Sequence, residues 1–380
     1  MRPAWRLAAG LLAMAALPGG APPALPLRLI DRIALPSDAI ADGYRVGGIS
    51  GIDRNPRDGR WYLISDDRSQ HGPAHFFVAT IDYDTDRPLH LALNKAVPLR
   101  DEAGTMFPLP GTGREASDAE SIRVDPAGRL IWSSEGDARD GFGPAVRTMK
   151  PDGSGTRVLP LPAMFAFDPA EKTGPRPNLS IEGLTFAPPS KALWLSLEAP
   201  LFQDGPVASP RLGADIRLTR LGANGRIGAQ YAYPLDPIGP VPAGRLADNG
   251  VSEILAIDDT HLLVLERSGQ EQEDGDFRYH VRLYCADLAS GTDIRALPAL
   301  AGGAYRPVAK HLVLDFATLP APRIDNVEAM GWGHVLSNGH ASLVFATDND
   351  FSPNRATQFL AFELNAGRNR AARVRALCRG

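Results

Sequence analysis

The sequence has no excess of positive charge and very few cysteines. Its 40 lysines and arginines are outnumbered by 44 aspartates and glutamates, which gives a formal net charge of −4. A basic surface for nucleic acid is therefore not expected. Cys285 and Cys378 are the two cysteines of the chain, too few for a structural zinc site built from cysteine alone. Export would permit a disulfide between them, and the sequence leaves the bridged and the free state open.

The local motifs of several enzyme classes are also absent. The sequence contains no Gly-x-Ser-x-Gly of serine hydrolases, no His-Glu-x-x-His of zinc proteases and no Walker-type glycine loop. No segment shows a helical period of useful length. A serine nucleophile and a mainly helical fold therefore have no support in the sequence.

The first residues have the order of an export signal. Arg2 and Arg6 precede an apolar stretch at 7–17, and small residues follow it up to Ala24. The stretch is too short to span a bilayer comfortably, and no second one follows. We expect residues 1–24 to be a signal peptide, with a frayed N-terminal helix as the alternative. Residues 25–380 would then form one exported domain, periplasmic or secreted.

Glycine and proline are frequent, with 38 and 34 residues, and they are spread along the chain as turn residues. The pairs Asp58-Gly59, Asp152-Gly153 and Asn224-Gly225 are typical of tight hairpin turns. This distribution predicts many short antiparallel strands in place of a disordered block.

One pattern occurs five times: a short strand, a turn and a second strand that ends on an acidic residue. Aligned on the first strand, the repeats begin 62 to 75 residues apart at Ser50, Glu120, Glu182, Glu253 and Glu328. The second strands end at Asp66, Glu135, Glu198, Glu266 and Asp348. Each interval has room for two further strands, and four antiparallel strands per repeat describe a propeller blade.

The predicted fold is therefore all-β: a single β-propeller of five four-stranded blades. The early segment 27–33 is expected to pair with the last repeat and close the ring, which removes exposed strand edges. A sixth blade assembled from the connections 100–117 and 161–178 is an open alternative. A two-sheet sandwich would leave the repeat unexplained.

The acidic positions of the repeats are expected to converge. The start of the first strand and the end of the second lie at the same rim of an antiparallel pair. So many like charges repel one another unless cations or protons neutralise them. Oxygen ligands suit Ca²⁺ best outside the cell, with Mg²⁺ or Mn²⁺ as alternatives. The predicted metal ligands are Glu120, Glu182, Glu253, Glu328 and Asp348.

Basic residues follow several of these acids. Arg68 follows Asp67, and Arg267 follows Glu266; a guanidinium beside a cation suits a phosphate or carboxylate group, although each also fits a salt bridge to the neighbouring acid. His71 and His75 lie in a loop near the first acidic end, where an acid or base would be useful and a solvated histidine is the plainer explanation. The predicted catalytic set is Asp66, Asp67, Arg68, Glu135, Glu198, Glu266 and Arg267.

Several of these segments together resemble a known family. They are residues 47–52, 64–69, 118–122, 181–184, 265–268, 325–328 and 346–351. In that order they resemble the phytase-like domain family, described by an "esterase-like activity of phytase", over roughly residues 40–365. The resemblance implies a propeller fold, bacterial export and hydrolysis of phosphate or other esters, and it assigns no catalytic residue. Ser50 stands where the other repeats have glutamate, which fits an opening for substrate or simple drift.

The leading hypothesis is an exported, metal-dependent hydrolase of phosphate or other esters that acts at an acidic channel mouth. A non-catalytic, calcium-stabilised propeller that binds a glycan or a protein is one alternative. A single-metal lactonase is another, and it would need fewer acids than are present. The expected partner is a small-molecule ester or phosphate, with no nucleic acid and no membrane span, and the protein is expected to be a monomer.

Overall fold

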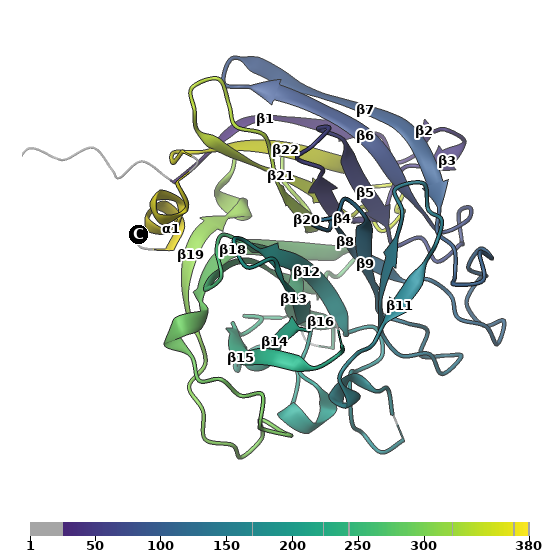
Figure 1. The fold of residues 1–380 in the computed structure, drawn as a ribbon, viewed down its shortest axis with the longest axis vertical. Coiled ribbons are helices and arrows are strands. Elements are labelled where there is room, and N and C mark those ends of the chain that lie inside the picture. The colour runs from purple at the N-terminus through teal and green to yellow at the C-terminus, as the bar shows by residue number, and fades with distance from the viewer. Residues whose placement is uncertain are drawn as a thin grey trace, which may run out of the picture.

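The computed structural model describes residues 26–378, except 169, 223, 242, 243, 321 and 368. This part of the chain forms five four-stranded antiparallel sheets around a common axis, as the five repeats predict (Figure 1). Within the described residues the remaining sheet is a small hairpin, β2 (Ile40–Ala41) and β3 (Tyr44–Arg45), so the connections form no sixth blade. The expected signal peptide, 1–24, lies outside the described residues.

Four blades consist of consecutive strands. Blade I contains β4 (Ile49–Arg54), β5 (Trp61–Ser65), β6 (His75–Asp84) and β7 (Arg87–Pro98). Blade II contains β8 (Ala119–Val124), β9 (Leu130–Ser134), β10 (Ala145–Met149) and β11 (Arg157–Leu159). Blade III contains β12 (Ile181–Ala187), β13 (Ala192–Leu197), β14 (Ala214–Leu221) and β15 (Ile227–Leu235). Blade IV contains β16 (Ala247–Ala256), β17 (His261–Glu271), β18 (Phe277–Asp287) and β19 (Ala309–Asp315).

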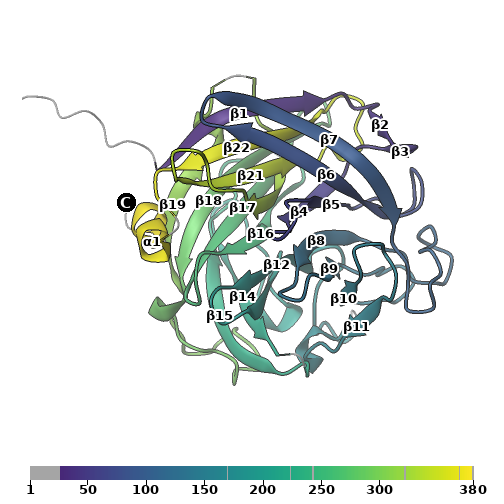
Figure 2. The ribbon, with the colours of Figure 1, turned by 45° about the horizontal axis from the view of Figure 1, so that its top comes forward.

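Blade V combines the two ends of the described chain. It contains β20 (Val327–Trp332), β21 (Ala341–Thr347), β22 (Thr357–Leu364) and β1 (Leu27–Leu35). The strand β1 pairs antiparallel with β22, so the early segment closes the ring as predicted. Closure in this way covers the edge that β22 would otherwise expose. In both ribbon views the inner strands β4, β8, β12 and β16 lie at the centre (Figure 2), and Figure 1 shows β20 beside them.

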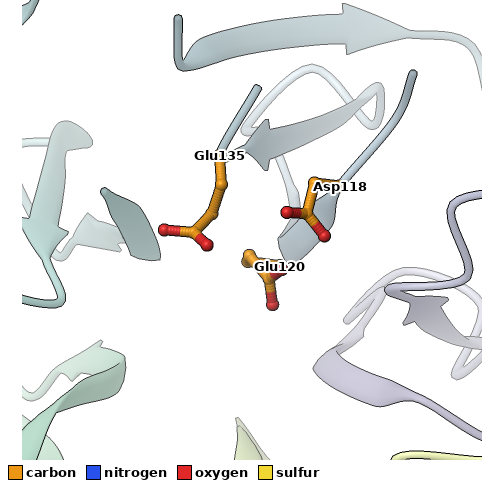
Figure 3. A group of neighbouring side chains, drawn as sticks. All are labelled: Asp118, Glu120 and Glu135. Carbon is orange, nitrogen blue, oxygen red and sulfur yellow. The ribbon is translucent and has the colours of Figure 1, made fainter. Parts of the chain in front are cut away.

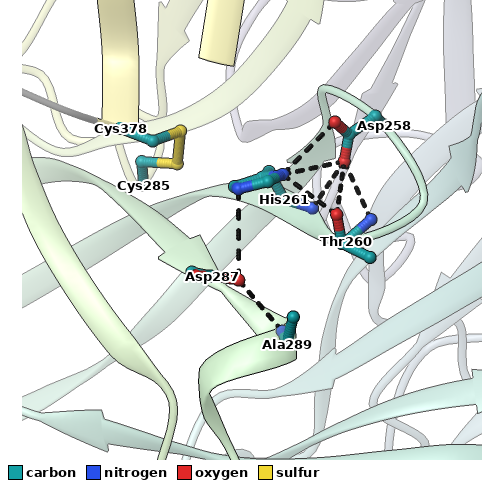
Figure 4. The surroundings of a disulfide bond; sticks show 7 residues. All are labelled: Asp258, Thr260, His261, Cys285, Asp287, Ala289 and Cys378. Carbon is teal, nitrogen blue, oxygen red and sulfur yellow. Dashed lines mark hydrogen bonds and ion pairs between the residues drawn. A yellow bond between two sulfur atoms is a disulfide. The ribbon is translucent and has the colours of Figure 1, made fainter. Parts of the chain in front are cut away.

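A C-terminal helix is tied to blade IV. The helix α1 (Arg370–Cys378) packs against β18 and β19, and a disulfide joins Cys378 to Cys285 on β18 (Figure 4). No helix in the described residues is long and apolar enough to cross a membrane. The other helical elements of the described part of the chain are four short 3₁₀ turns, at Ala163–Phe165, Phe202–Asp204, Leu288–Ser290 and Phe316–Thr318.

Each blade is packed between its two neighbours, and the strand period of two explains how. Successive side chains of a strand point to opposite faces. On β5, Trp61 and Leu63 pack in a cluster with residues of blade V, whereas Tyr62 and Ile64 pack in a cluster with residues of blade II. The strand β5 is buried at every position because both of its faces are covered. The core therefore lies between the blades and not along the axis.

The axis itself is closed by one arginine. Arg123 on β8 is 2% exposed. Its guanidinium donates to the carbonyl oxygens of Ile52, Leu184 and Ile254, at 2.5, 2.6 and 3.0 Å, so it links the inner strands of blades I, III and IV to its own. The Arg123 Nη2 also lies 2.7 Å from a carboxylate oxygen of Glu253. This buried ion pair lies between the two ends of the channel.

Candidate metal centre

The starts of the inner strands and the ends of the second strands meet at one end of the axis, as the repeats predict. They surround a cavity of about 190 Å³, which we call the acidic mouth. Two guanidinium groups, of Arg68 and Arg267, lie among its walls. Nine carboxylates line the same cavity: Asp66, Glu120, Glu135, Glu182, Glu198, Asp248, Glu328, Asp348 and Asp350.

A β-bulge in each inner strand turns these side chains toward the axis. In β12 the pairing with β13 skips Glu182 and Gly183, so two residues share the space of one. The same irregularity occurs at Ser50 in β4, before Ile122 in β8 and at Glu328 in β20. Bulges re-aim side chains at sheet rims in this way. The repeated glutamate therefore points into the channel because of the bulge.

Blade IV departs from the alignment that the sequence suggests. The bulge in β16 lies at Ser252, one residue before Glu253, and Arg267, within β17, pairs with Gly250. Ser252 and Arg267 thus occupy the positions that hold acids in blades II and III. The sequence alignment of this repeat on Glu253 and Glu266 is wrong by one residue. In both strands a glutamate lies next to the position that the structure aligns with the other blades. The repeat pattern in the sequence was therefore compatible with either alignment.

The two displaced glutamates have structural contacts elsewhere. Glu253 accepts hydrogen bonds from the Ser121 hydroxyl at 2.9 Å and from its neighbour's N–H, in addition to its ion pair with Arg123. Glu266 lies 2.7 Å from Lys310 Nζ and accepts a hydrogen bond from the Asn249 side chain at 2.9 Å. Neither glutamate is among the residues that line the acidic mouth.

Arg267 neutralises part of the mouth. Its guanidinium lies 2.8 Å from a carboxylate oxygen of Glu198 and 3.5 Å from one of Glu328. Burial lowers the pKa of Arg267, but Glu328 and Glu198 together raise this pKa well above its usual range. Arg68 is likewise paired, with Asp118 at 2.5 Å. Both guanidinium groups of the mouth are therefore engaged by carboxylates.

Blades II and III bring carboxylates closest together. Ligand oxygens of Asp118, Glu120 and Glu135 lie within 4.8 Å of one another, and so do those of Glu135, Glu182 and Glu198. Figure 3 shows the first group, whose three side chains lie close together. Each group offers three carboxylates to a cation, and Glu135 is common to both.

Burial changes the acidity of this cluster. It raises the pKa of Glu198 and that of Glu328 to about 7 each, although Arg267 lowers both. Burial also raises the pKa of Asp118 to about 6, against the effect of Arg68. For Glu120 and Glu182, burial and neighbouring carboxylates both raise the pKa well above its ordinary value. Protons or cations are needed to neutralise these groups at neutral pH.

The carboxylates also have oxygens free for a ligand. Glu182 is 7% exposed, and the described residues provide no hydrogen bond or ion pair to its carboxylate. The Oδ1 atom of Asp66 is buried and has no partner among them either. Gly48, with φ +59°, makes room for this group: a Cβ there would lie 1.9 Å from Asp66 Oδ1. A set of oxygen donors without nitrogen or sulfur fits Ca²⁺ or Mg²⁺.

The remaining predicted site residues divide between two places. Asp348 lines the acidic mouth with Asp66, whereas Asp67 turns into a neighbouring cavity and caps its own loop. The sequence alignment missed Asp118 and Asp248. Asp118 could have been found from the sequence, because it lies two residues before Glu120 and directly before the same strand, β8. Asp248 could not, because it reaches the mouth through the extra length of β16.

Several solved structures are similar at low identity. The tail fiber of Staphylococcus aureus phage P68 is 11% identical with a TM-score of 0.41, and the match covers 95% of this chain and 57% of that chain. The catalytic domain of the Coprinopsis cinerea GH62 α-L-arabinofuranosidase is 14% identical with a TM-score of 0.41, covering 87% and 99%. An exo-1,5-α-L-arabinanase from a bovine ruminal metagenomic library is 9% identical with a TM-score of 0.41, covering 87% and 97%. These likenesses are too distant to bear on the chemistry.

The sequence itself gives a clearer relationship. No curated protein matches the chain. A family model named phytase-like, with the description "Esterase-like activity of phytase", matches residues 44–351. The match includes all five inner strands and every residue that lines the acidic mouth. The chain therefore belongs to the phytase-like family.

Proposed function

We propose that the protein is an exported hydrolase that holds divalent cations at the acidic mouth and cleaves phosphate or other esters there. The observation that carries the proposal is the pair of three-carboxylate groups that share Glu135. Family membership supports ester hydrolysis, and the disulfide between Cys285 and Cys378 supports export, since disulfides persist in oxidising compartments.

The residues of blades II and III would hold the cations. Asp118, Glu120 and Glu135 would bind one, and Glu135, Glu182 and Glu198 a second, with Ca²⁺ favoured over Mg²⁺ or Mn²⁺. A bound cation would polarise the ester and lower the pKa of a bound water. Glu253 and Glu266 have no part in this proposal, because their carboxylates are engaged away from the mouth.

The charges of the mouth set the order of events. Nine carboxylates face two paired guanidinium groups across a cavity of about 190 Å³. An anionic substrate would be repelled by this cavity until cations bind. Arg68 lines both the mouth and the neighbouring cavity, and its side chain is 34% exposed, so it is the better placed of the two arginines to contact substrate. Arg267 would mainly balance charge.

One observation favours a second candidate. Arg68 and Arg267 are both engaged by carboxylates of the protein, which leaves the mouth without a free cationic side chain. A calcium-stabilised propeller that binds a glycan or protein at its rim needs no such group. A single-metal lactonase fits less well, because two groups of carboxylates are present.

The test is hydrolysis with and without metal. Purified protein should cleave 4-nitrophenyl phosphate or 4-nitrophenyl acetate, lose this activity in a chelator and recover it when Ca²⁺, Mg²⁺ or Mn²⁺ is restored. Glu182→Gln should lower the rate about a hundredfold, because it removes a donor from the second group. Glu171→Gln, on an exposed loop, is the matched control and should change little. Tight cation binding without any hydrolysis would favour the binding propeller.

A further inference from the structure

A second cavity adjoins the acidic mouth. Its volume is about 240 Å³. Its walls are Asp66, Asp67, Arg68, Gln70, His71, Asp350 and Phe351. Three of these residues, Asp66, Arg68 and Asp350, also line the acidic mouth, so the two cavities are neighbours. Among the described residues that line the two cavities, His71 is the one imidazole.

The imidazole of His71 is held on one face and one edge. Its ring stacks on the ring of Phe351, with centroids 4.2 Å apart and planes within 16°. Its Nδ1 lies 3.6 Å from Oδ1 of Asp67. Asp67 is 3% exposed and is itself fixed by the N–H groups of Gln70 and His71, at 2.7 and 3.1 Å. The described residues offer no hydrogen-bond partner to the Nε2 atom of His71. The side chain of His71 is 32% exposed.

The stacking partner sits in an unusual backbone conformation. Asp350 and Phe351 have φ angles of +49° and +50°, in a backbone region that residues other than glycine rarely adopt. Gly47 makes room for the ring, since a Cβ there would lie 2.9 Å from it. Arg45 donates to the Phe351 carbonyl oxygen at 2.9 Å. Such conformations cost energy, persist where the surroundings enforce them, and are frequent at functional sites.

The nearby His75 provides a contrast. It is 1% exposed, its ring lies 4.6 Å from that of Tyr44 and 4.7 Å from that of Phe77, and its Nδ1 lies 3.0 Å from the Pro73 carbonyl oxygen. Burial lowers the pKa of His75, which keeps the ring neutral. His75 is therefore a packing residue, whereas His71 faces a cavity that opens beside the acidic mouth.

We propose that His71 is the general acid that protonates the leaving oxygen in the ester hydrolysis proposed above, on which this inference rests. The attacking water forms the new bond to phosphorus or to the acyl carbon. The ester bond to the leaving oxygen breaks, and its electron pair goes to that oxygen, which takes the proton from His71. The water's surplus proton passes to solvent, and His71 is reprotonated from solvent.

An imidazole suits this task because one ring nitrogen can be held by a carboxylate while the other donates a proton to the substrate. The charged groups around its ring are Asp67 behind it, with Asp66, Arg68 and Asp350 on the cavity walls, and Arg45 beyond Phe351. Asp67 acts as a positioning residue, because it holds the loop and the Nδ1 edge of the ring.

The test compares two esters that differ in the leaving group. A 4-nitrophenolate departs without a proton, whereas an alkoxide needs one. His71→Asn should lower kcat for an alkyl ester about a hundredfold or more, and kcat for the matching 4-nitrophenyl ester less than tenfold. Asp67→Asn should have the same signature with a smaller effect. The exposed His90→Asn is the matched control and should change neither rate.

Each outcome has a distinct meaning. Equal loss on the two esters would overturn the role of His71, because a residue that only binds substrate does not respond to the leaving group. An unchanged rate on the alkyl ester would overturn it as well. Absence of hydrolysis by the unaltered protein would instead remove the proposed function. A melting temperature within a few degrees of the unaltered protein's shows that the variants are folded.

Discussion

Blades III and IV have the same four-stranded architecture but bring different charges to the mouth. Blade III presents Glu182 and Glu198, whereas blade IV presents Ser252 and Arg267 at the matching positions. Arg267 then contacts Glu198 of blade III and Glu328 of blade V. The charge of this mouth is thus set blade by blade, by the residue at the bulge of the inner strand and by the residue at the matching position of the second strand. Blade IV supplies an internal counter-ion, and blades II and III retain the carboxylates available for cations.

The acids of blade IV stabilise the fold in other ways. Glu253 is paired with Arg123 on the axis, and Glu266 is paired with Lys310. Breaking a buried ion pair by removing one partner costs more than losing an exposed pair, because a buried charge is left uncompensated. Mutations can therefore test whether the acids of the mouth and those of blade IV have different roles.

The largest effect is expected from Arg123→Met. It removes the counter-ion of Glu253 and the links to three other inner strands. The free energy of unfolding should fall by about 3 to 5 kcal/mol, measured by urea denaturation in the absence of metal. Arg87→Met, which removes an exposed pair with Asp82, is the control and should cost less than about 1 kcal/mol. Equal costs would contradict the structural role of Glu253.

A smaller effect is expected from Arg267→Glu, which gives blade IV the charge of blade III. Glu198 and Glu328 lose their counter-ion and gain a like charge, so the free energy of unfolding in chelator should fall by about 2 to 3 kcal/mol. Millimolar Ca²⁺ should restore more stability to this variant than to the unaltered protein. Arg220→Glu, on the exposed side of β14, should show no such calcium dependence beyond the unaltered protein's.

The fold was predictable from sequence because its signal recurs. Five alternating strand pairs with acidic ends predict five blades, and the segment 27–33 predicts the closing strand. The site was predictable only in part. Whether Ser252 or Glu253 falls in the bulge depends on strand pairing, which the residue types do not specify. The partnership of Arg267 with two acids depends on the neighbouring blades, and the contribution of Asp248 depends on the extra length of β16. No local sequence pattern encodes either.

A graded effect is expected from pH. The pKa values of Glu198 and Glu328 are raised to about 7, and that of Asp118 to about 6, so the folded protein binds protons that the unfolded chain releases. The stability from these groups is fully present below about pH 4 and is lost as pH rises through the folded pKa values. In chelator, the free energy of unfolding should fall by about 1.4 kcal/mol per pH unit for each of these groups as pH rises. This holds between the pKa of the group in the unfolded chain and its pKa in the folded protein.

Melting temperatures between pH 5 and 8 check this expectation. They should fall with rising pH in chelator, and Ca²⁺ should flatten the profile by replacing the protons. Glu198→Gln should reduce the slope in chelator. Melting temperatures that do not change with pH in chelator would mean that water solvates the charged carboxylates well enough, so that neither protons nor metal is needed.

The most direct test of the account is the number of calcium ions bound at the acidic mouth. Calorimetric titration of metal-free protein should give two ions per chain, and Glu135→Gln should weaken both by tenfold or more, because Glu135 belongs to both carboxylate groups. Glu253→Gln, the matched glutamate of blade IV, should retain both ions with unchanged affinity, since its carboxylate is engaged by Arg123. A protein that binds no calcium, or a Glu135→Gln variant that binds it as well as the unaltered chain, would contradict the account.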